Sequence, residues 1–282
     1  MSSISILPFG DSLTSGYYDY GQNSHPYCKI LKKKLEKNFE EITFSCRHKG
    51  IPGEMAKKMA KRLNKVLQKK SYDYIIILAG TNDYADTNDA QPIIASLETL
   101  YQMVLNENKR GINSKKTTQL IAVTIPECDA DEGYEKKKKQ KKKINNWIRN
   151  FAQENQPFCH LYDLFQEIPY SGIDEDLQQK IWDDGLHLKP YGYDLFGKGL
   201  AKLLTQIIFE TNSNKKEKKG KEKEKEKGKE KTKIKENNQT QTKHKHKKKE
   251  KEKEKEKEKE KEKEKEKEKE KEKEKEKEKA NN

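Results

Sequence analysis

Short apolar runs alternate with amphipathic segments over the first 210 residues of the chain. Runs of four to six residues rich in Ile, Leu, Val, Phe and Tyr predict strands, and they lie at Ile4–Phe9, Ile42–Cys46, Tyr74–Ala79, Gln119–Thr124 and Cys159–Tyr162. The third run, YIIILA, is apolar almost without interruption. This pattern is typical of a parallel strand that is covered on both faces.

Between these runs, apolar residues recur at spacings of three and four, as they do on one face of an α-helix. One such segment covers residues 56–67 and carries Lys and Arg on its other face, and similar segments cover residues 97–105, 144–152 and 200–208. Alternating strands and helices predict a three-layer α/β/α fold with a parallel sheet. Ligands bind such sheets at the carboxyl ends of the strands, so the residues that follow each strand are the candidates for chemistry.

Four segments rich in glycine and polar residues follow these strands: Gly10–Thr14, Gly50–Glu54, Gly80–Asp83 and Asp184–His187. Each has an ordinary structural explanation when taken alone, because Asp and Ser cap helices and because Gly, Asn and Asp favour turns. Together they offer a group for every role in ester hydrolysis. That reaction needs a hydroxyl nucleophile, a base, a carboxylate that orients the base, and donors for an oxyanion.

The nucleophile and base are assigned first. Ser12 supplies the hydroxyl, and His187 supplies an imidazole, a group that changes protonation near neutral pH. Asp184 is three residues before the histidine and is placed to accept its other N–H, whereas the adjacent Asp183 lacks this spacing. The other histidines of this part of the chain lack a carboxylate at such spacing: His25, His48 and His160.

The oxyanion donors are the backbone N–H of Ser12, a backbone N–H of the second segment and the side-chain amide of Asn82. In the second segment both Gly50 and Gly53 are candidates. Glu54, beside them, is expected either to line the mouth of the pocket or to be an acid in the first turn of the next helix.

These four segments resemble the sequence blocks of the SGNH hydrolases, also called GDSL lipases or esterases. That family has a nucleophilic Ser in G-D-S-L, an oxyanion-hole Gly, an oxyanion-hole Asn in G-x-N-D and a C-terminal D-x-x-H, and all four occur here in that order. The resemblance covers residues 3–209 and includes two smaller cues, Asn145-x-x-Ile148 and Gly192-Tyr193. The G-x-S-x-G elbow of the α/β-hydrolases is absent.

The resemblance implies a flavodoxin-like sheet of five parallel strands in the order 2-1-3-4-5. It also implies acyl transfer to water without a metal ion or other cofactor. The family pattern G-x-x-G-[DE] favours Gly53 as the oxyanion donor, with Gly50 in the preceding turn. Asp11, Gly80 and Asp83 then occupy supporting positions.

The charge of the chain is unevenly distributed. The 282 residues carry a formal net charge of +14, and residues 213–282 alone hold 32 Lys and 21 Glu, which is +11 of that total. We therefore predict an SGNH/GDSL hydrolase domain over residues 1–212 and a low-complexity, Lys/Glu-rich tail over residues 213–282. Because the domain is close to neutral, the basic pI gives no reason to expect specific binding of nucleic acid.

The tail offers nothing apolar to bury, since Glu and Lys alternate strictly from Glu250 to Lys279. This composition predicts a solvated, fluctuating segment, with an extended helix as the alternative. The cluster Lys243–Lys249 is the part of the tail that would make weak contacts with acidic partners. A second basic run, Lys136–Lys143, is expected to be the solvated face of a helix.

The four cysteines are scattered without a C-x-x-C pair, so we expect reduced thiols rather than a disulfide framework or a zinc site. The N-terminus has no basic region and no long apolar run of the kind found in signal peptides. No stretch approaches the roughly 18–20 apolar residues of a membrane span. These features predict a cytoplasmic protein, with nuclear import through the basic tail as the alternative.

We therefore expect a serine ester hydrolase whose partner is a small-molecule ester, either a short-acyl ester or a lysophospholipid. A narrow aromatic mouth is expected from the residues that follow the strands, namely Tyr17, Tyr18, Tyr84 and Ile125-Pro126. The alternative is a catalytically idle protein of the same fold that acts as a binding or scaffold module through its tail.

Overall fold

Five parallel strands form the central sheet in the order β4-β1-β6-β7-β8, which confirms the expected order 2-1-3-4-5. Their bounds in the computed structural model are β1 Ser2–Gly10, β4 Ile42–Cys46, β6 Tyr74–Leu78, β7 Gln119–Val123 and β8 Cys159–Tyr162. A short strand, β5 (Lys49–Gly50), also pairs with the carboxyl end of β1. The structure describes residues 2–110, 117–131 and 133–280.

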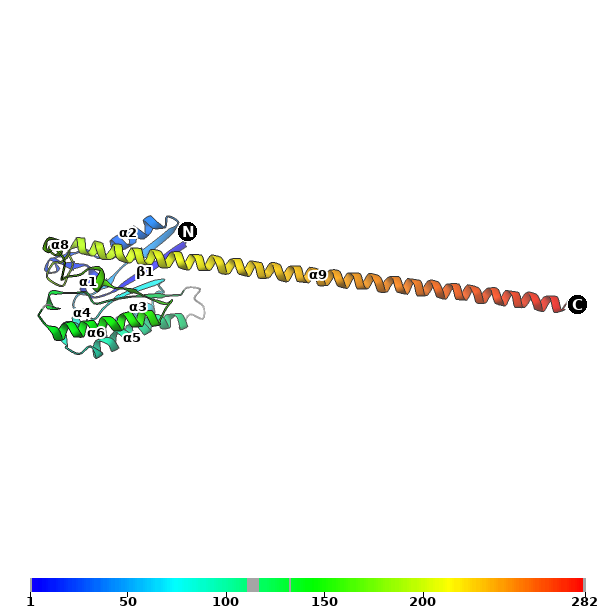
Figure 1. The fold of residues 1–282 in the computed structure, drawn as a ribbon, viewed down its shortest axis with the longest axis horizontal. Helices are drawn as coiled ribbons and strands as arrows, with labels where there is room; N and C mark the ends of the chain where they lie inside the picture. The colour runs from blue at the N-terminus through cyan, green and yellow to red at the C-terminus, as the bar shows by residue number, and fades with distance from the viewer. Residues whose placement is uncertain (1, 111–116, 132, 281–282) are drawn as a thin grey trace. The chain divides into compact units, whose positions relative to one another are not determined.

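Helices cover both faces of the sheet, as a three-layer fold requires (Figure 1). On one face lie α3 (Ala56–Leu67), α5 (Gln91–Arg110) and α6 (Glu135–Glu154). On the other lie α2 (Cys28–Asn38), α8 (Glu175–Ile181) and the first turns of α9 (Pro190–Ala280). Three short helices follow strands at the carboxyl edge: α1 (Ser12–Ser15), α4 (Thr81–Asp86) and α7 (Leu164–Glu167). A hairpin of β2 (Tyr17–Tyr18) and β3 (Asn23–Ser24) comes between α1 and α2.

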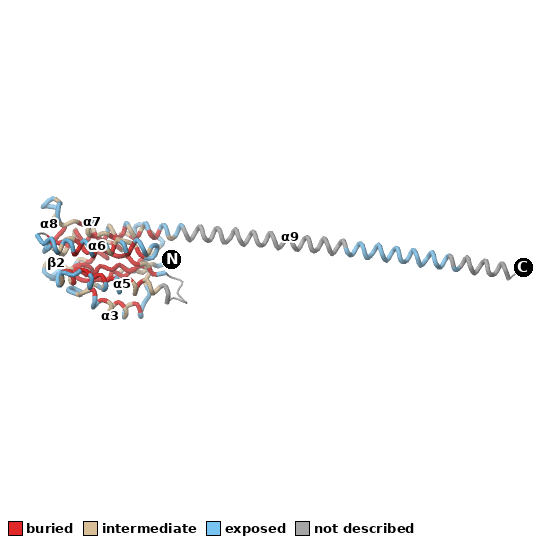
Figure 2. Tube along the Cα trace, turned by 60° about the horizontal axis from the view of Figure 1, so that its bottom comes forward, coloured by how far each residue is buried: buried red, intermediate tan, exposed pale blue. Residues whose placement is uncertain are grey.

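Strand β6 shows why its sequence is apolar almost throughout. Ile75 and Ile77 pack with residues of α3, α5 and α6, whereas Tyr74, Ile76 and Leu78 pack with residues of α2 and α9. All five are buried, in the interior that Figure 2 shows in red. Successive side chains of a strand point to opposite faces, so a strand covered by helices on both sides needs apolar residues at every position.

Helix α2 was not predicted by the apolar pattern. Only three of its 11 residues are buried, Cys28, Leu31 and Leu35, and lysines fill many of the other positions. The apolar stripe is therefore too sparse to show the helical spacing clearly.

Residues Met1–Phe209 and Glu210–Asn282 form two separate units. Helix α9 continues through the second unit to Ala280, so the tail has the helical form of the two that were considered. Residues 247–267 are all exposed, as their pale blue colour in Figure 2 indicates. This is expected where no apolar face exists to be buried. Within the described residues, no helix combines the length and the apolar character that are needed to cross a membrane.

Asn145 joins α6 to the segment that follows β7. Its Oδ1 accepts the N–H of Ile125 at 2.9 Å, and its Nδ2 donates to the carbonyl oxygen of Ile125, also at 2.9 Å. Asn145 is 1% exposed. Ile125 lies beyond the last residue of β7, so its main-chain groups have left the strand ladder and depend on this amide.

We expect Asn145→Ala to lower the free energy of unfolding by about 2–4 kcal/mol, because it leaves the N–H and C=O of Ile125 buried without partners. Urea unfolding followed by circular dichroism measures the change. The matched control is Asn146→Ala, at an exposed position of the same helix, which should change stability by less than about 0.5 kcal/mol. Equal losses in the two variants would contradict the role given to Asn145.

Candidate active site

Ser12, His187 and Asp184 form a continuous chain of hydrogen bonds at the carboxyl edge of the sheet. The Ser12 Oγ lies 2.9 Å from His187 Nε2, across a sequence separation of 175 residues. The His187 Nδ1 lies 2.7 Å from Asp184 Oδ2. Ser12 is 6% exposed, and the side chains of His187 and Asp184 are 13% and 27% exposed. The structure thus brings together the three residues expected to act as nucleophile, base and orienting carboxylate.

A tight turn holds Asp184 against His187. The Asp184 Oδ1 accepts the backbone N–H groups of Leu186 at 3.2 Å and His187 at 2.8 Å. Gly185 has a φ of +79°, which favours glycine, and a Cβ there would lie 2.6 Å from the Asp129 carboxyl. Partial burial acts to raise the pKa of Asp184, but the hydrogen bonds from His187 outweigh it and lower that pKa. The carboxylate therefore stays ionised where it faces the imidazole.

Asp183, the neighbouring acid, has a different partner. Its Oδ2 accepts the N–H of Asp19 at 2.6 Å, and its own backbone N–H donates to the carbonyl oxygen of His187 at 2.8 Å. Asp183 thereby ties the loop after β2 to the turn that carries His187. Of the two adjacent acids, Asp184 is the one that bonds to the imidazole.

Close packing of the main chain places Ser12. At Gly10, the last residue of β1, a Cβ would lie 2.2 Å from a main-chain oxygen of β6. At Gly50, its partner in β5, a Cβ would lie 2.3 Å from the nitrogen of Ser15. The Gly50 N–H also points to His48 Nδ1 at 3.4 Å. Gly50 therefore serves the close approach of β5 to α1.

Asp11 caps α1 from a fully buried position. Its Oδ1 accepts the N–H of Leu13 at 3.1 Å, which fixes the helical turn that starts at Ser12. Its other oxygen has no hydrogen-bond partner among the described residues. Burial raises the pKa of Asp11 to about 7 against the lowering effect of the Leu13 hydrogen bond, and the nearby Asp83 adds to the increase.

Three N–H groups are available near the nucleophile. Ser12 is the first residue of α1, so its N–H has no acceptor within the helix. Gly53 has a φ of +75° and open space where a Cβ would be, and its N–H donates to none of the described residues. The Asn82 Nδ2 donates to the carbonyl oxygen of Glu54 at 3.1 Å. One hydrogen bond fixes the amide and leaves its second N–H for another acceptor.

Gly80 and Asp83 hold α4, the helix that carries Asn82. Gly80 comes directly before α4 with a φ of +97°, a conformation that favours glycine. The Asp83 Oδ2 accepts the N–H of Ala56 at 2.8 Å. Ala56 is the first residue of α3, so this carboxylate satisfies an N–H that has no acceptor within the helix. A single side chain therefore ties α4 to the loop that contains Gly53.

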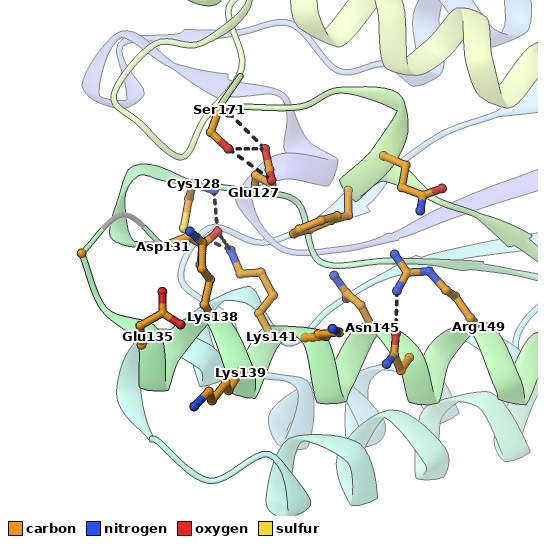
Figure 3. A pocket seen from close by; sticks show the side chains of 15 residues that line it. Glu127, Cys128, Asp131, Glu135, Lys138, Lys139, Lys141, Asn145, Arg149 and Ser171 are labelled. Atoms are coloured by element: carbon orange, nitrogen blue, oxygen red, sulfur yellow. Dashed lines mark hydrogen bonds and ion pairs between the residues drawn. The ribbon is translucent and has the colours of Figure 1, made fainter. Parts of the chain in front are cut away.

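The start of α6 holds the other end of α4. The Lys137 Nζ donates to the carbonyl oxygens of Tyr84 at 2.5 Å and Thr87 at 2.9 Å, where α4 ends. The Tyr84 hydroxyl donates to Asp131 Oδ1 at 2.6 Å. The Lys141 Nζ in turn lies 2.5 Å from Asp131 Oδ2, a contact drawn in Figure 3. Sequence reasoning missed the role of these four side chains, which connect α4, the segment after β7 and α6.

The expectation that Lys136–Lys143 is a solvated helix face is therefore wrong in part. Lys141 is 1% exposed, and its ammonium also donates to the carbonyl oxygen of Pro126 at 2.7 Å and contacts Cys128 Sγ at 3.2 Å. Gln140 is buried as well. Lysine is almost never fully buried without partners, and the partners of Lys141 lie outside the basic run. Within the run, the only indication of which residues are buried is that residues three and four apart lie on the same helix face, and this indication is weak.

Of the residues expected at an aromatic mouth, Tyr17 lies beside the candidate base. Its ring centroid lies 4.5 Å from that of His187. Tyr18 packs against the hydrophobic cluster of α2 and α9. Tyr84 is 3% exposed and Ile125-Pro126 is buried, so the prediction is wrong for these residues. They follow strands as expected, but their side chains complete the core.

Glu54 forms an ion pair with Arg62. The Arg62 guanidinium also donates to the carbonyl oxygen of Gly10 at 3.1 Å and lies 3.9 Å from the centroid of the Phe9 ring. Helix α3 begins at Ala56 and has no acid in its first turn, so the interpretation of Glu54 as a first-turn acid is wrong. Glu54 instead helps to hold the second segment against the end of β1.

Two further histidines have partners that sequence spacing could not reveal. His25 Nε2 lies 2.9 Å from Asp194 Oδ1, 169 residues later in the chain. His160 Nε2 lies 2.8 Å from Gln119 Oε1 on the neighbouring strand. Within the described residues, no group of three or more His, Cys, Asp or Glu side chains is arranged to hold a metal ion.

We expect the stability of the folded chain to fall between about pH 4 and about pH 7 because of Asp11. In this range the folded chain keeps the Asp11 proton, whereas the unfolded chain loses it near the ordinary value of 3.8. Since the folded state then binds more protons, raising the pH favours unfolding, by on the order of 4 kcal/mol across the range.

The Asp11→Asn variant keeps a capping side chain and should lose this part of the pH dependence. Urea unfolding at about pH 5 and about pH 7 gives the free energy of unfolding of both proteins at each pH. The change between the two pH values should be smaller in the variant. The same pH dependence in both proteins would rule out a protonated Asp11.

The fold is similar to that of several solved bacterial structures. A putative arylesterase from Agrobacterium tumefaciens is 22% identical, with a TM-score of 0.57 over 72% of this chain and 99% of that chain. A carbohydrate acetylesterase from Sinorhizobium meliloti is 17% identical, with a TM-score of 0.55 over 72% and 99%. A lipase/acylhydrolase from Enterococcus faecalis is 24% identical, with a TM-score of 0.56 over 72% and 96%. At these identities the likeness concerns the fold.

Comparison of the sequence also assigns the chain to a family. Comparison with curated protein sequences gave no match. The model of the GDSL-like lipase/acylhydrolase family, however, matches residues 9–195, which is more than half of the chain. This match covers all four segments that carry the candidate site. The chain therefore belongs to the GDSL-like lipase/acylhydrolase family and is an ester hydrolase.

Proposed function

We propose that the reaction is ester hydrolysis with Ser12 as the nucleophile, His187 as the general base and Asp184 as the carboxylate that orients it. The observation that carries this proposal is the hydrogen-bond chain from Ser12 Oγ to His187, at 2.9 Å, and on to Asp184, at 2.7 Å. These distances are within hydrogen-bond reach for a nucleophile and base. Backbone contacts hold each end of the chain, so the groups are positioned before substrate arrives.

In the first step, Ser12 Oγ attacks the carbonyl carbon of the ester while its proton passes to His187 Nε2. A C–O bond forms, and the electrons of the carbonyl double bond move to its oxygen. We assign the stabilisation of this oxyanion to the N–H groups of Ser12 and Gly53 and to the second N–H of the Asn82 amide. Each such donor typically contributes about 2.7–4 kcal/mol in the transition state.

In the second step, the tetrahedral intermediate expels the alcohol, which takes the proton from the His187 imidazolium. Water then attacks the acyl group on Ser12 and gives its proton to His187. Collapse of the second intermediate releases the carboxylic acid and returns a proton to Ser12 Oγ. Asp184 stays ionised throughout because its pKa is lowered, and its charge stabilises the imidazolium.

The access to the nucleophile favours a small acyl group. Ser12 is only 6% exposed, and the Tyr17 ring lies beside His187 with centroids 4.5 Å apart. The similar solved structures include an arylesterase and a carbohydrate acetylesterase, names that refer to aryl esters and to acetyl esters. We therefore infer short-acyl esters as the substrates, with lysophospholipids as the other class to be tested.

Ser12→Ala should reduce kcat/KM for p-nitrophenyl acetate about a thousandfold or more, because no other group replaces the nucleophile. The release of p-nitrophenol measures the rate, and p-nitrophenyl esters of longer acyl chains and lysophosphatidylcholine extend the assay. Rates should fall as the acyl chain lengthens.

The matched control is Ser71→Ala, at an exposed position before β6, which should retain wild-type activity. A fluorophosphonate probe should label the wild-type chain and spare Ser12→Ala. Full activity in Ser12→Ala would refute the assignment. Failure of the wild-type chain to hydrolyse any of the esters would leave the binding or scaffold function as the better interpretation.

Lys137 should support catalysis through α4, since its ammonium holds the end of the helix that carries Asn82. We expect Lys137→Met to lower kcat for p-nitrophenyl acetate about tenfold with little change in KM, because a misplaced oxyanion donor acts mainly on the transition state. Lys137→Arg should restore part of the rate. Lys136→Met, an exposed neighbour, is the control. A less stable Lys137→Met variant with wild-type kcat would contradict this positioning role.

A further inference from the structure

A cavity of about 890 Å³ lies along α6. This volume falls in the range of roughly 300–1,000 Å³ that is typical of small-molecule sites. Along α6 its lining extends from Glu135 to Arg149, a helical rise of about 21 Å. The opposite walls are the segment after β7, helix α7 and the loop between α7 and α8 (Figure 3). Ser12, Asn82 and His187 are not among the lining residues, so the cavity is distinct from the candidate active site.

The cations that line the cavity all come from α6: Lys138, Lys139, Lys141, Lys142 and Arg149. Two of them are already neutralised by neighbouring carboxylates. Lys141 pairs with Asp131 at 2.5 Å, and Arg149 pairs with Asp163 at 2.7 Å. These two cations are parts of the framework, and their donors are engaged in holding the walls together.

Three lysines have no counter-ion among the residues that the structure describes. Lys138, Lys139 and Lys142 are exposed, and none of them forms an ion pair with any residue in the described part of the chain. Lys138 and Lys142 are i,i+4 neighbours, and like charges at this spacing destabilise a helix. An anion in the cavity would relieve this repulsion.

The acids of the cavity do not supply the missing charge. Glu127 Oε2 accepts the N–H groups of Tyr170 at 2.7 Å and Ser171 at 3.1 Å. Figure 3 shows Glu127 and Ser171 bonded to each other on the wall opposite α6. Glu135 lies one helical turn before Lys138 and Lys139, but it forms no ion pair with either of them and is one acid against three lysines. The middle of the α6 wall, from Lys138 to Lys142, therefore keeps a net positive charge.

We propose that this cavity binds a small organic polyanion, a phosphate or a polycarboxylate, whose charge is neutralised by Lys138, Lys139 and Lys142. Lysine is a strongly hydrated point charge that binds phosphate and carboxylate oxygens without a fixed geometry. Phe165 and Gln166 also line the cavity and offer an aromatic ring and an amide to the organic part of the ligand. The site takes no part in the ester hydrolysis proposed above.

Neither tryptophan lines the cavity, but both lie on or contact elements that form its walls, and neither belongs to the tail. The chain has two tryptophans, and neither lies in residues 213–282. Trp147 is on α6, next to the lining residue Asn146. The Trp182 Nε1 donates to the carbonyl oxygen of Pro169 at 3.1 Å, in the loop opposite α6. Anions that bind only to the basic tail leave both indoles unchanged.

We expect inorganic pyrophosphate or citrate, titrated into the full chain at constant ionic strength, to bind with saturation at millimolar concentrations or below. Isothermal titration calorimetry measures the binding, and tryptophan fluorescence is followed in parallel. The ligand that binds more tightly distinguishes phosphate from polycarboxylate. The double variant Lys138→Glu/Lys142→Glu should weaken binding about tenfold or more, because two attractive charges become repulsive. The control Lys136→Glu/Lys143→Glu makes the same change at exposed positions outside the cavity, and it should shift binding less than about twofold.

The absence of saturable binding with either ligand, measured by calorimetry, would overturn the proposal. So would equal weakening in the two double variants, which would indicate unspecific attraction to a basic helix. Ser12→Ala should bind as the wild-type chain does. If Ser12 is not the nucleophile, the esterase assay of Ser12→Ala shows it. If the cavity binds no anion, the titration of the wild-type chain shows it, so the two proposals fail in different experiments.

Discussion

The packing at the end of β1 is so close that the main chain itself fixes the nucleophile. A Cβ would lie 2.2 Å from a backbone oxygen at Gly10 and 2.3 Å from a backbone nitrogen at Gly50. Because β1 pairs with β4, β5 and β6, the turn after it cannot shift without breaking hydrogen bonds on both sides. Ser12 is thus held by the sheet, and His187, which comes 175 residues later, meets a hydroxyl whose position is already determined.

Buried polar side chains fix the loops and short helices around the end of β1. Asp83 ties α4 to the start of α3, and Lys137 ties the end of α4 to α6. Burying a charge costs free energy unless several partners replace water. Lys141 meets this condition with a carboxylate, a carbonyl oxygen and a thiol. These contacts orient the groups around Asn82 before any ester binds, and such preorganisation is a main source of transition-state stabilisation.

Periodicity and local spacing predicted the parts of the molecule that depend on neighbours in sequence. The strands and the Asp184–His187 pair are of this kind, since a turn of three residues brings that acid to its histidine. The order of the strands was implied only by the resemblance to the SGNH hydrolases. Lys141 and Tyr84 were misread because their common partner, Asp131, is ten residues from one and 47 from the other. The position of Tyr84 after a strand indicates the edge of the sheet on which it lies, but only the packed structure shows which way its side chain points.

For charge, too, the total over the domain differs from what is found at one place on its surface. Residues 213–282 hold +11 of the +14 net charge, so the remaining domain is close to neutral. This argues against long-range attraction of a large polyanion to the domain. It says little about a cavity, where interactions over a few ångströms decide the outcome. Acids elsewhere on the domain balance the sum without neutralising Lys138 and Lys142 on one face of α6. A nearly neutral domain can therefore carry a local site for a small anion, which the composition of the chain conceals.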